Sequence, residues 1–464
     1  MYDQAIRDSG ATAAEPSILQ ATEPDGAPRI AVLDILRGIA ILGILFMNIN
    51  DMGGSLWSMF GDVRHLGWTQ ADQVAWWLRE VIANGTARCM LELLFGAGMV
   101  ILTDRAALSL GKRVVMKRYY LRNVVLLGFG IVHLFILLWP GDILHSYAIA
   151  ALAAFLFRRM RPRWLITIGL VAAIAQLGAG GYFGYYQAMQ ERSHVAAINA
   201  ARNAGRPVTA DDRKLLAKVA TDDTKRAKSK AESRAKVVAE DKARTGSFAT
   251  WAAMQWSVTV ALQSQGFELI VFWEAVSVML IGAALYKLGI LQGARSRSFY
   301  LRMTLIAYAV AIPLRIVGAI EQTRFDGAPK TMWATAEVAR EAMTLGHVGA
   351  VCLLLGTGFG ATLLRPFIAA GRTALSIYIL QTIVCLWILF PPFGLALYGT
   401  LGWAQLMATA LAINIGLLLL ANAYVRRFDI APVEWAWRSL VEGRALPWRK
   451  TAPPPPFSGE LRPV

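Results

Sequence analysis

Long apolar stretches separated by short basic segments limit this 464-residue chain to one broad kind of fold. Hydrophobic residues make up 56% of the sequence, charged residues make up 17%, and the mean hydropathy is +0.45. An apolar helix of about 20 residues crosses the roughly 30 Å hydrocarbon core of a bilayer. We therefore predict an all-α fold, a polytopic integral membrane helical bundle, rather than two or three soluble domains.

About ten segments have the length and composition of membrane spans. They lie near 30–50, 88–103, 119–139, 143–157, 164–186, 267–291, 299–320, 341–364, 371–390 and 401–424. The basic segments that follow the second, fourth, sixth, eighth and tenth spans all fall on one side of the membrane. Because short cytoplasmic loops are enriched in Lys and Arg, we expect this side, with both termini, to be cytoplasmic.

The composition divides the chain into five parts. They are a disordered cytoplasmic tail at 1–29, a transmembrane bundle at 30–186, a charged extracytoplasmic insert at 187–248, a second transmembrane bundle at 249–425, and a basic, Pro-rich cytoplasmic tail at 426–464. Within the insert, Thr209 and Asp212 offer an N-cap for a long helix that runs to Arg244. The insert is predicted to be a helical hairpin or to be partly disordered.

The net charge of +16 does not predict a nucleic-acid partner, because most Lys and Arg residues lie in the segments between spans. Topology and contact with anionic lipid headgroups explain this charge. The three cysteines, Cys89, Cys352 and Cys385, fall in apolar segments without paired spacing. The sequence therefore predicts neither a disulfide framework nor a metal site.

Ionisable residues inside apolar spans are the main functional candidates, because placing charge in a membrane is costly. Arg122 and His133 lie eleven residues apart, which is about 16 Å along one face of a helix. A corner at 139–141 then leads to Asp142 and His145, where an aspartate could orient an imidazole. The alternatives are snorkelling of Arg122, a structural hydrogen bond from His133, and an N-cap role for Asp142.

Asp34 and Arg37 form a second pair, three residues apart in the first turns of the first span. They could form a structural ion pair. Alternatively, Arg37 joins Arg122 in binding phosphate groups, since guanidinium suits bidentate contact. Tyr378, Gln381 and Cys385 share a helical stripe that is typical of hydrogen bonding between helices. The sequence carries no Gly-rich phosphate loop and no soluble-enzyme nucleophile motif.

Five segments resemble the YeiB family of bacterial membrane proteins, also called domain of unknown function 418. They read LDILRGIAILGILFMNI, LLFGAG, RNVVLLGFGIVHLFILLWPGDILHSYAI, GRTALSIYILQ and APVEWAWRSL. They are distributed over nearly the whole chain, apart from the tail ends and the insert. The resemblance implies a multi-pass protein of the bacterial cytoplasmic (inner) membrane.

The LDxLRGIA opening of the first span is also similar to that of acyltransferase-3 membrane enzymes. Arg122 and His133 match the motif of those enzymes, which is a basic residue, ten spacer residues and a histidine. The heparan-glucosaminide acetyltransferase group resembles these enzymes within the wider transmembrane acyltransferase superfamily. This resemblance implies an acyl-CoA donor, with acetyl-CoA expected, that enters from the cytoplasm. Asn48 stands where those enzymes usually carry a histidine, which leaves His133 as the main candidate base.

Three classes of function are therefore open. The first is a membrane-embedded acyltransferase that moves an acyl group from acyl-CoA to a hydroxyl or amine acceptor at or beyond the membrane. Its candidate catalytic residues are His133, Asp142, His145 and Asp34, its donor-binding residues are Arg37 and Arg122, and no metal is expected.

The second class is a transporter or flippase for an anionic solute or lipid that uses the same residues. The third is a protein that binds a partner through the insert. The expected partners are membrane lipids and a small-molecule, glycan or lipid acceptor, and the sequence leaves the oligomeric state open.

Overall fold

The protein is an all-α membrane protein in a computed structural model that describes residues 20–22, 28–60, 62–109, 112–177, 181–264 and 266–449. Two three-residue strands, β1 (Gln20–Thr22) and β2 (Pro28–Ile30), pair antiparallel before the first helix. Most of the tail predicted at 1–29 and the end of the tail beyond residue 449 lie outside the described residues.

The helices follow one another from the N-terminal bundle, through a projecting pair, to the C-terminal bundle. The first group is α1 (Ala31–Gly53), η1 (Leu56–Phe60), η2 (Val63–Leu66), α2 (Gln70–Leu78), η3 (Arg79–Ala83), α3 (Thr86–Ser109), α4 (Lys112–Phe135), α5 (Leu144–Ala154), η4 (Phe155–Phe157) and α6 (Pro162–Leu177). The projecting pair is α7 (Phe183–Asn203) and α8 (Ala210–Arg244). The last group is α9 (Phe248–Ser264), α10 (Phe267–Lys287), α11 (Arg297–Thr323), α12 (Met332–Leu355), α13 (Gly358–Leu364), α14 (Pro366–Arg372), α15 (Ala374–Thr382), η6 (Ile383–Leu389), α16 (Trp403–Arg427) and α17 (Pro432–Glu442).

Six helices in the described part of the chain are long and apolar enough to cross a membrane. They are Ala31–Gly53, Gln70–Thr103, Glu268–Lys287, Arg297–Thr323, Met332–Leu355 and Trp403–Arg427. The predicted count of about ten is not confirmed. One reason is that the spans predicted near 143–157 and 164–186 correspond to apolar helices of fewer than 18 residues, Leu144–Phe157 and Pro162–Ala175.

The span predicted at 371–390 corresponds mainly to the helix Ala374–Leu389, and the bend at its start was not predicted. Helix α14 and the continuous helix Ala374–Leu389 meet at a bend of 80°, and together they would make a seventh, broken span. Glycines hold α14 against α1, because a Cβ atom at Gly38 or Gly371 would collide with the backbone of the other helix. The loop predicted at 104–118 is also largely helical, since α3 runs to Ser109 and α4 begins at Lys112.

Helix α10 packs closely against α3, α5 and α6. A Cβ atom at Gly96 of α3 would collide with the carbonyl of Met279, and one at Gly282 of α10 would collide with that of Leu93. Gly96 and Gly282 therefore permit the close approach of α3 and α10. Gly98, two residues after Gly96, has open space around it.

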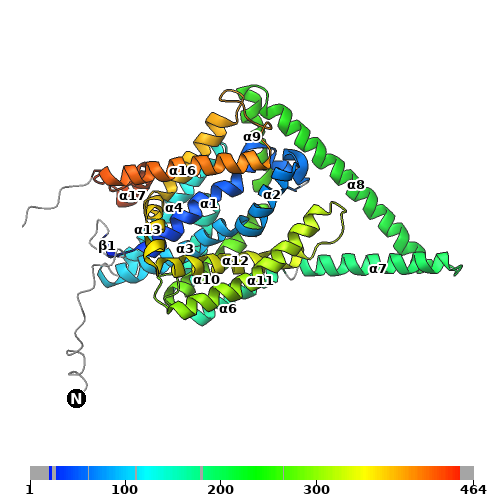
Figure 1. Ribbon diagram of the computed structural model, residues 1–464, viewed down its shortest axis with the longest axis horizontal. Helices are drawn as coiled ribbons and strands as arrows, with labels where there is room; N and C mark the ends of the chain where they lie inside the picture. Colours follow the sequence, from blue (N-terminus) through cyan, green and yellow to red (C-terminus); the bar gives the residue numbers. More distant parts are fainter. Residues whose placement is uncertain are drawn as a thin grey trace, which may run out of the picture.

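Helices α7 and α8, called the arm here, project from one end of the bundle and meet at a tip (Figure 1). The helix predicted to run from a Thr209 cap to Arg244 is confirmed. Thr209 and Asp212 form a capping box, with the Asp212 N–H donating to the Thr209 hydroxyl at 3.2 Å and the Thr209 N–H donating to the Asp212 carboxylate at 3.0 Å. The insert is therefore a helical hairpin within the residues described.

The C-terminal end of α8 is anchored to the end of α1 through Glu240 and Arg244, of which 0% and 1% is exposed. The Arg244 guanidinium donates to the carbonyls of Asp51 at 3.0 Å and Gly54 at 2.8 Å. The Glu240 carboxylate accepts from the Ser55 hydroxyl at 2.5 Å. We call these two side chains and residues 51–57 the arm base.

Helix α17 supplies the hydrogen-bond acceptor for the first N–H groups of α15. Thr373 at the start of α15 makes no side-chain cap. Instead, the Glu434 carboxylate accepts from the backbone N–H groups of Leu375 at 2.7 Å and Ser376 at 3.2 Å. The broken span thus depends on a residue that follows the last long helix in sequence.

Candidate functional site

His133, near the end of α4, and Asp142, in the following loop, meet inside the bundle. The distance from His133 Nδ1 to Asp142 Oδ1 is 2.6 Å, and both side chains are fully buried. Contact is possible because the chain reverses between α4 and α5. Leu138 in this turn has a positive φ of 57°, and the Trp139 N–H donates to the His133 carbonyl at 3.2 Å. A left-handed leucine is uncommon, and such strain often accompanies a functional site.

The second ring nitrogen of His133 faces α15. His133 Nε2 lies 2.8 Å from the hydroxyl oxygen of Thr382, which is fully buried. One turn earlier on the same helix, the Tyr378 ring contacts the imidazole edge to face, with ring centres 4.8 Å apart. Both ring nitrogens of His133 are therefore engaged.

Asp142 accepts hydrogen bonds on both carboxylate oxygens. Oδ1 faces His133 Nδ1 and the Tyr378 hydroxyl, the latter at 3.4 Å. Oδ2 accepts from the backbone N–H of His145 at 2.9 Å and lies 2.8 Å from its Nδ1. Four donors suit an ionised carboxylate, which only accepts. Asp142 thus orients two imidazoles and also binds an N–H at the start of α5, as both earlier interpretations of this residue expected.

His145 lies between two carboxylates. Its Nε2 is 3.0 Å from Glu268 Oε2, while its Nδ1 faces Asp142. Glu268 also accepts from Ser146 Oγ at 2.8 Å and Gln263 Nε2 at 2.9 Å. Two carboxylate acceptors favour an imidazole that donates from both nitrogens, which is the charged form.

These contacts assign the tautomer of His133. If Asp142 is ionised, Nδ1 of His133 carries the proton that bonds to it. A neutral imidazole then leaves Nε2 as an acceptor, and the Thr382 hydroxyl donates to it. This is the arrangement of a general base: a carboxylate fixes the imidazole, and the lone pair on the other imidazole nitrogen points at a hydroxyl.

The other predicted site residues lie elsewhere. Asp34 and Arg37 form the predicted ion pair at 2.8 Å in the first turns of α1. Arg122 lies on α4, about 16 Å before His133 along the helix axis. Its guanidinium stacks over the indole of Trp437 at 4.1 Å. Neither arginine is brought against His133 in the structure.

A second group of buried charges lies between α3, α10 and α12, and we call it the ion cluster. It consists of Arg88, Glu92, Glu274, Glu337 and Arg340. The Arg340 guanidinium is 3.2 Å from Glu92 and 2.6 Å from Glu274, and it also pairs with Glu337. Three carboxylates face two guanidinium groups. Sequence analysis did not identify this cluster, because its members come together only through the packing of three helices that are far apart in sequence.

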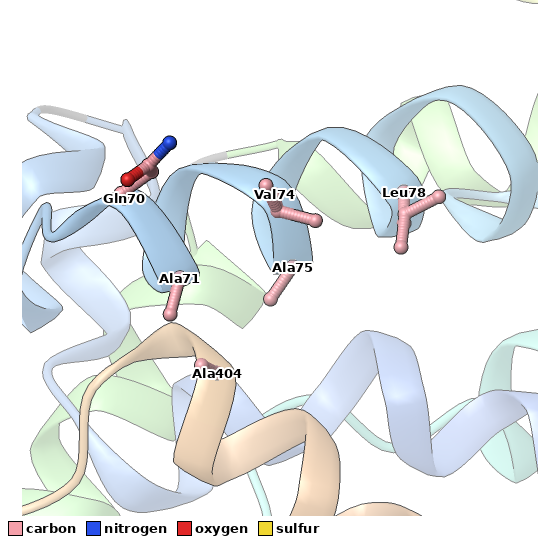
Figure 2. Close-up of a pocket in the computed structure, with 6 residues that line it drawn as sticks. All are labelled: Gln70, Ala71, Val74, Ala75, Leu78 and Ala404. Atoms are coloured by element: carbon pink, nitrogen blue, oxygen red, sulfur yellow. The ribbon is translucent and has the colours of Figure 1, made fainter.

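An open surface pocket lies where α2 meets the start of α16. It is lined by Gln70, Ala71, Val74, Ala75, Leu78 and Ala404. Figure 2 shows Ala71 and Ala75 on the side of α2 that faces Ala404. This lining contains no ionisable side chain, so the pocket offers no acid or base.

Long apolar helices and buried ionisable groups define a polytopic helical membrane protein with its candidate site inside the bundle. Residues 285–444 match the family described as protein of unknown function (DUF418). Over those residues the chain is similar to this family.

Two similar proteins cover nearly the whole chain. The uncharacterized protein YxaH of Bacillus subtilis (strain 168) is 27% identical over 91% of this chain and 96% of its own length. The uncharacterized protein YeiB of Escherichia coli (strain K12) is 25% identical over 90% of this chain and 98% of its own length. No solved structure gives a significant match.

Proposed function

We propose that this protein is a membrane-embedded acyltransferase that uses His133 as general base. The observation that carries the proposal is the buried pair of Asp142 and His133, with the second imidazole nitrogen directed at a hydroxyl 2.8 Å away. Acyl transfer to a hydroxyl or amine needs a base that removes the proton of the attacking group. The Asp142 carboxylate would stabilise the imidazolium that forms in that step.

The donor in this proposal is an acyl-CoA, with acetyl-CoA expected from the resemblance to acyltransferase-3 enzymes. Arg37 and Arg122 are proposed to bind its phosphates at the end of the bundle opposite the arm. That end would be the cytoplasmic face of a bacterial inner membrane, with both termini in the cytoplasm. Because His133 and Thr382 are closed off from solvent, the thioester would reach them only when the surrounding helices part.

The test uses purified protein in lipid nanodiscs with labelled acetyl-CoA, and it measures release of CoA and transfer of label to lipid, glycan or amine acceptors. His133→Ala should lose turnover while it keeps the elution volume of the folded protein, and its thermal stability should fall because Asp142 loses a buried partner. His347→Ala is the matched control, because this imidazole also lies in a long helix but is bonded to the Tyr308 hydroxyl at 2.8 Å. Turnover by His133→Ala equal to wild type would refute the proposal.

A second candidate, transport of an anionic solute or lipid, is favoured by two features. The broken span at Thr373 and the ion cluster are both typical of transporters, which place discontinuous helices and buried charges at their binding sites. A transporter would move label across sealed proteoliposomes without releasing CoA. This outcome separates the two functions in one preparation.

A further inference from the structure

We propose that Thr382 carries the acyl group as a covalent ester between donor and acceptor, an inference that rests on the proposed acyltransferase function. Asp142, His133 and Thr382 form a continuous line of carboxylate, imidazole and hydroxyl. The joining distances are 2.6 Å and 2.8 Å. A nucleophile bonded to a base that is itself held by a third group is the general arrangement of an activated hydroxyl.

The hydroxyl of Thr382 is directed differently from other buried threonine hydroxyls of these helices. A helical threonine commonly donates to the carbonyl four residues earlier. Thr373 does so to Ala369 at 3.0 Å, and Thr344 does so to Arg340 at 2.8 Å. Thr382 instead bonds to His133 Nε2, on a helix 249 residues away in sequence.

The backbone at Thr382 gives a second, independent reason. Thr382 is the last residue of α15, and the π-helical turns of η6 begin at the next residue. Short π-helical turns inside α-helices leave the normal backbone register and occur frequently at functional sites. The bend between α14 and α15 lies nine residues before Thr382. The hydroxyl thus lies between two irregular points of one span.

The chemistry balances without an additional reactant. In the first step, His133 Nε2 takes the Thr382 proton while Oγ1 attacks the thioester carbonyl. The C–S bond breaks, and the CoA thiolate leaves with that proton as a thiol. In the second step, an acceptor hydroxyl or amine gives its proton to Nε2 and attacks the ester. The C–O bond to Thr382 breaks, and Oγ1 regains a proton from the imidazolium.

The experiment incubates the full-length protein in nanodiscs with labelled acetyl-CoA and no acceptor, then denatures and digests it to locate the label. Wild type should carry one acyl group on the peptide that contains position 382. Thr382→Val should lose this label and reduce transfer by at least about 100-fold. Thr382→Ser should keep the label at the same position, because it keeps a hydroxyl. Thr259→Val is the matched control, because this buried hydroxyl donates to the Gln255 carbonyl at 2.9 Å, and it should behave as wild type.

Thr382→Cys tests whether Thr382→Val loses activity only because its structure is disturbed. A thiol at this position should take the acyl group as a thioester, which neutral hydroxylamine removes. Two outcomes would overturn the proposed acyl ester on Thr382: transfer by Thr382→Val at the wild-type rate, or transfer by wild type with no label at position 382. Either outcome would leave the acyltransferase proposal intact. Wild-type protein that neither transfers label nor releases CoA would overturn both.

Discussion

Replacement of Arg244 by methionine should open the arm base while leaving the bundle folded. The guanidinium donates to three backbone carbonyls at the end of α1 and lies 3.2 Å from the Glu240 carboxylate. Methionine fills much of the same volume but leaves Glu240 buried without its cation. Breaking a buried ion pair from one side costs about 3–5 kcal/mol. Glu240 keeps its bonds to residues 55–57, so we expect the lower value, about 3 kcal/mol.

Hydrogen–deuterium exchange measures this opening peptide by peptide. Since 1.36 kcal/mol corresponds to a factor of ten, about 3 kcal/mol predicts roughly 100-fold faster exchange at residues 51–57 and 240–248. Arg234→Met is the control, because this residue lies on the same helix and is exposed. Acceleration below about fivefold would refute the reasoning. Equal acceleration in every peptide would instead show that the whole bundle had lost stability.

Three further outcomes are expected. First, the pKa of His65 is raised above its ordinary value of 6.5 because its side chain bonds to Asp241. This bond between η2 and α8 therefore stabilises the protein fully below pH 6.5, and the contribution is lost as the pH rises through the raised pKa. Exchange of these residues, corrected for intrinsic rates, should accelerate as the pH rises above 6.5 in wild type but not in His65→Gln. Second, Arg340→Met removes the cation shared by the buried Glu92 and Glu274 and the half-buried Glu337, and it should lower the free energy of unfolding in mixed detergent by about 3–5 kcal/mol. A loss under about 1 kcal/mol would mean that the ion cluster is not structural. Third, Gly96→Ala places a methyl group against the Met279 carbonyl and should cost about 1–3 kcal/mol by the same measurement, and an unchanged value would contradict the close helix contact.

Local sequence signals predicted the parts of the fold that local interactions determine. The Thr209 capping box and the apolar length of α1 are read directly from neighbouring residues, and both agree with the structure. The bend at the start of the span predicted at 371–390 was not foreseen, because it depends on contact with another helix. In that stretch, apolar content alone could not distinguish a straight helix from a broken one.

The candidate site was predictable in part. Burial cost identified His133 and Asp142 separately. The corner at 139–141 was interpreted only as the link to Asp142 and His145, and the contact between Asp142 and His133 was not predicted. Thr382 carried no such signal, because it is uncharged and reaches His133 only through packing of distant helices. The same reason explains why Glu268 was not predicted to be the partner of His145.

The position of Glu434 has a consequence for how the polypeptide is made. A ribosome releases Leu375 and Ser376 nearly sixty residues before it releases the carboxylate that binds their N–H groups. During that interval the start of α15 cannot adopt its final pairing, because the partner has not been synthesised. Insertion of this span should therefore finish only after translation of α17. A chain that stops before Pro432 should leave the translocation machinery with the start of α15 not yet in its final structure, although it contains Asp142, His133 and Thr382.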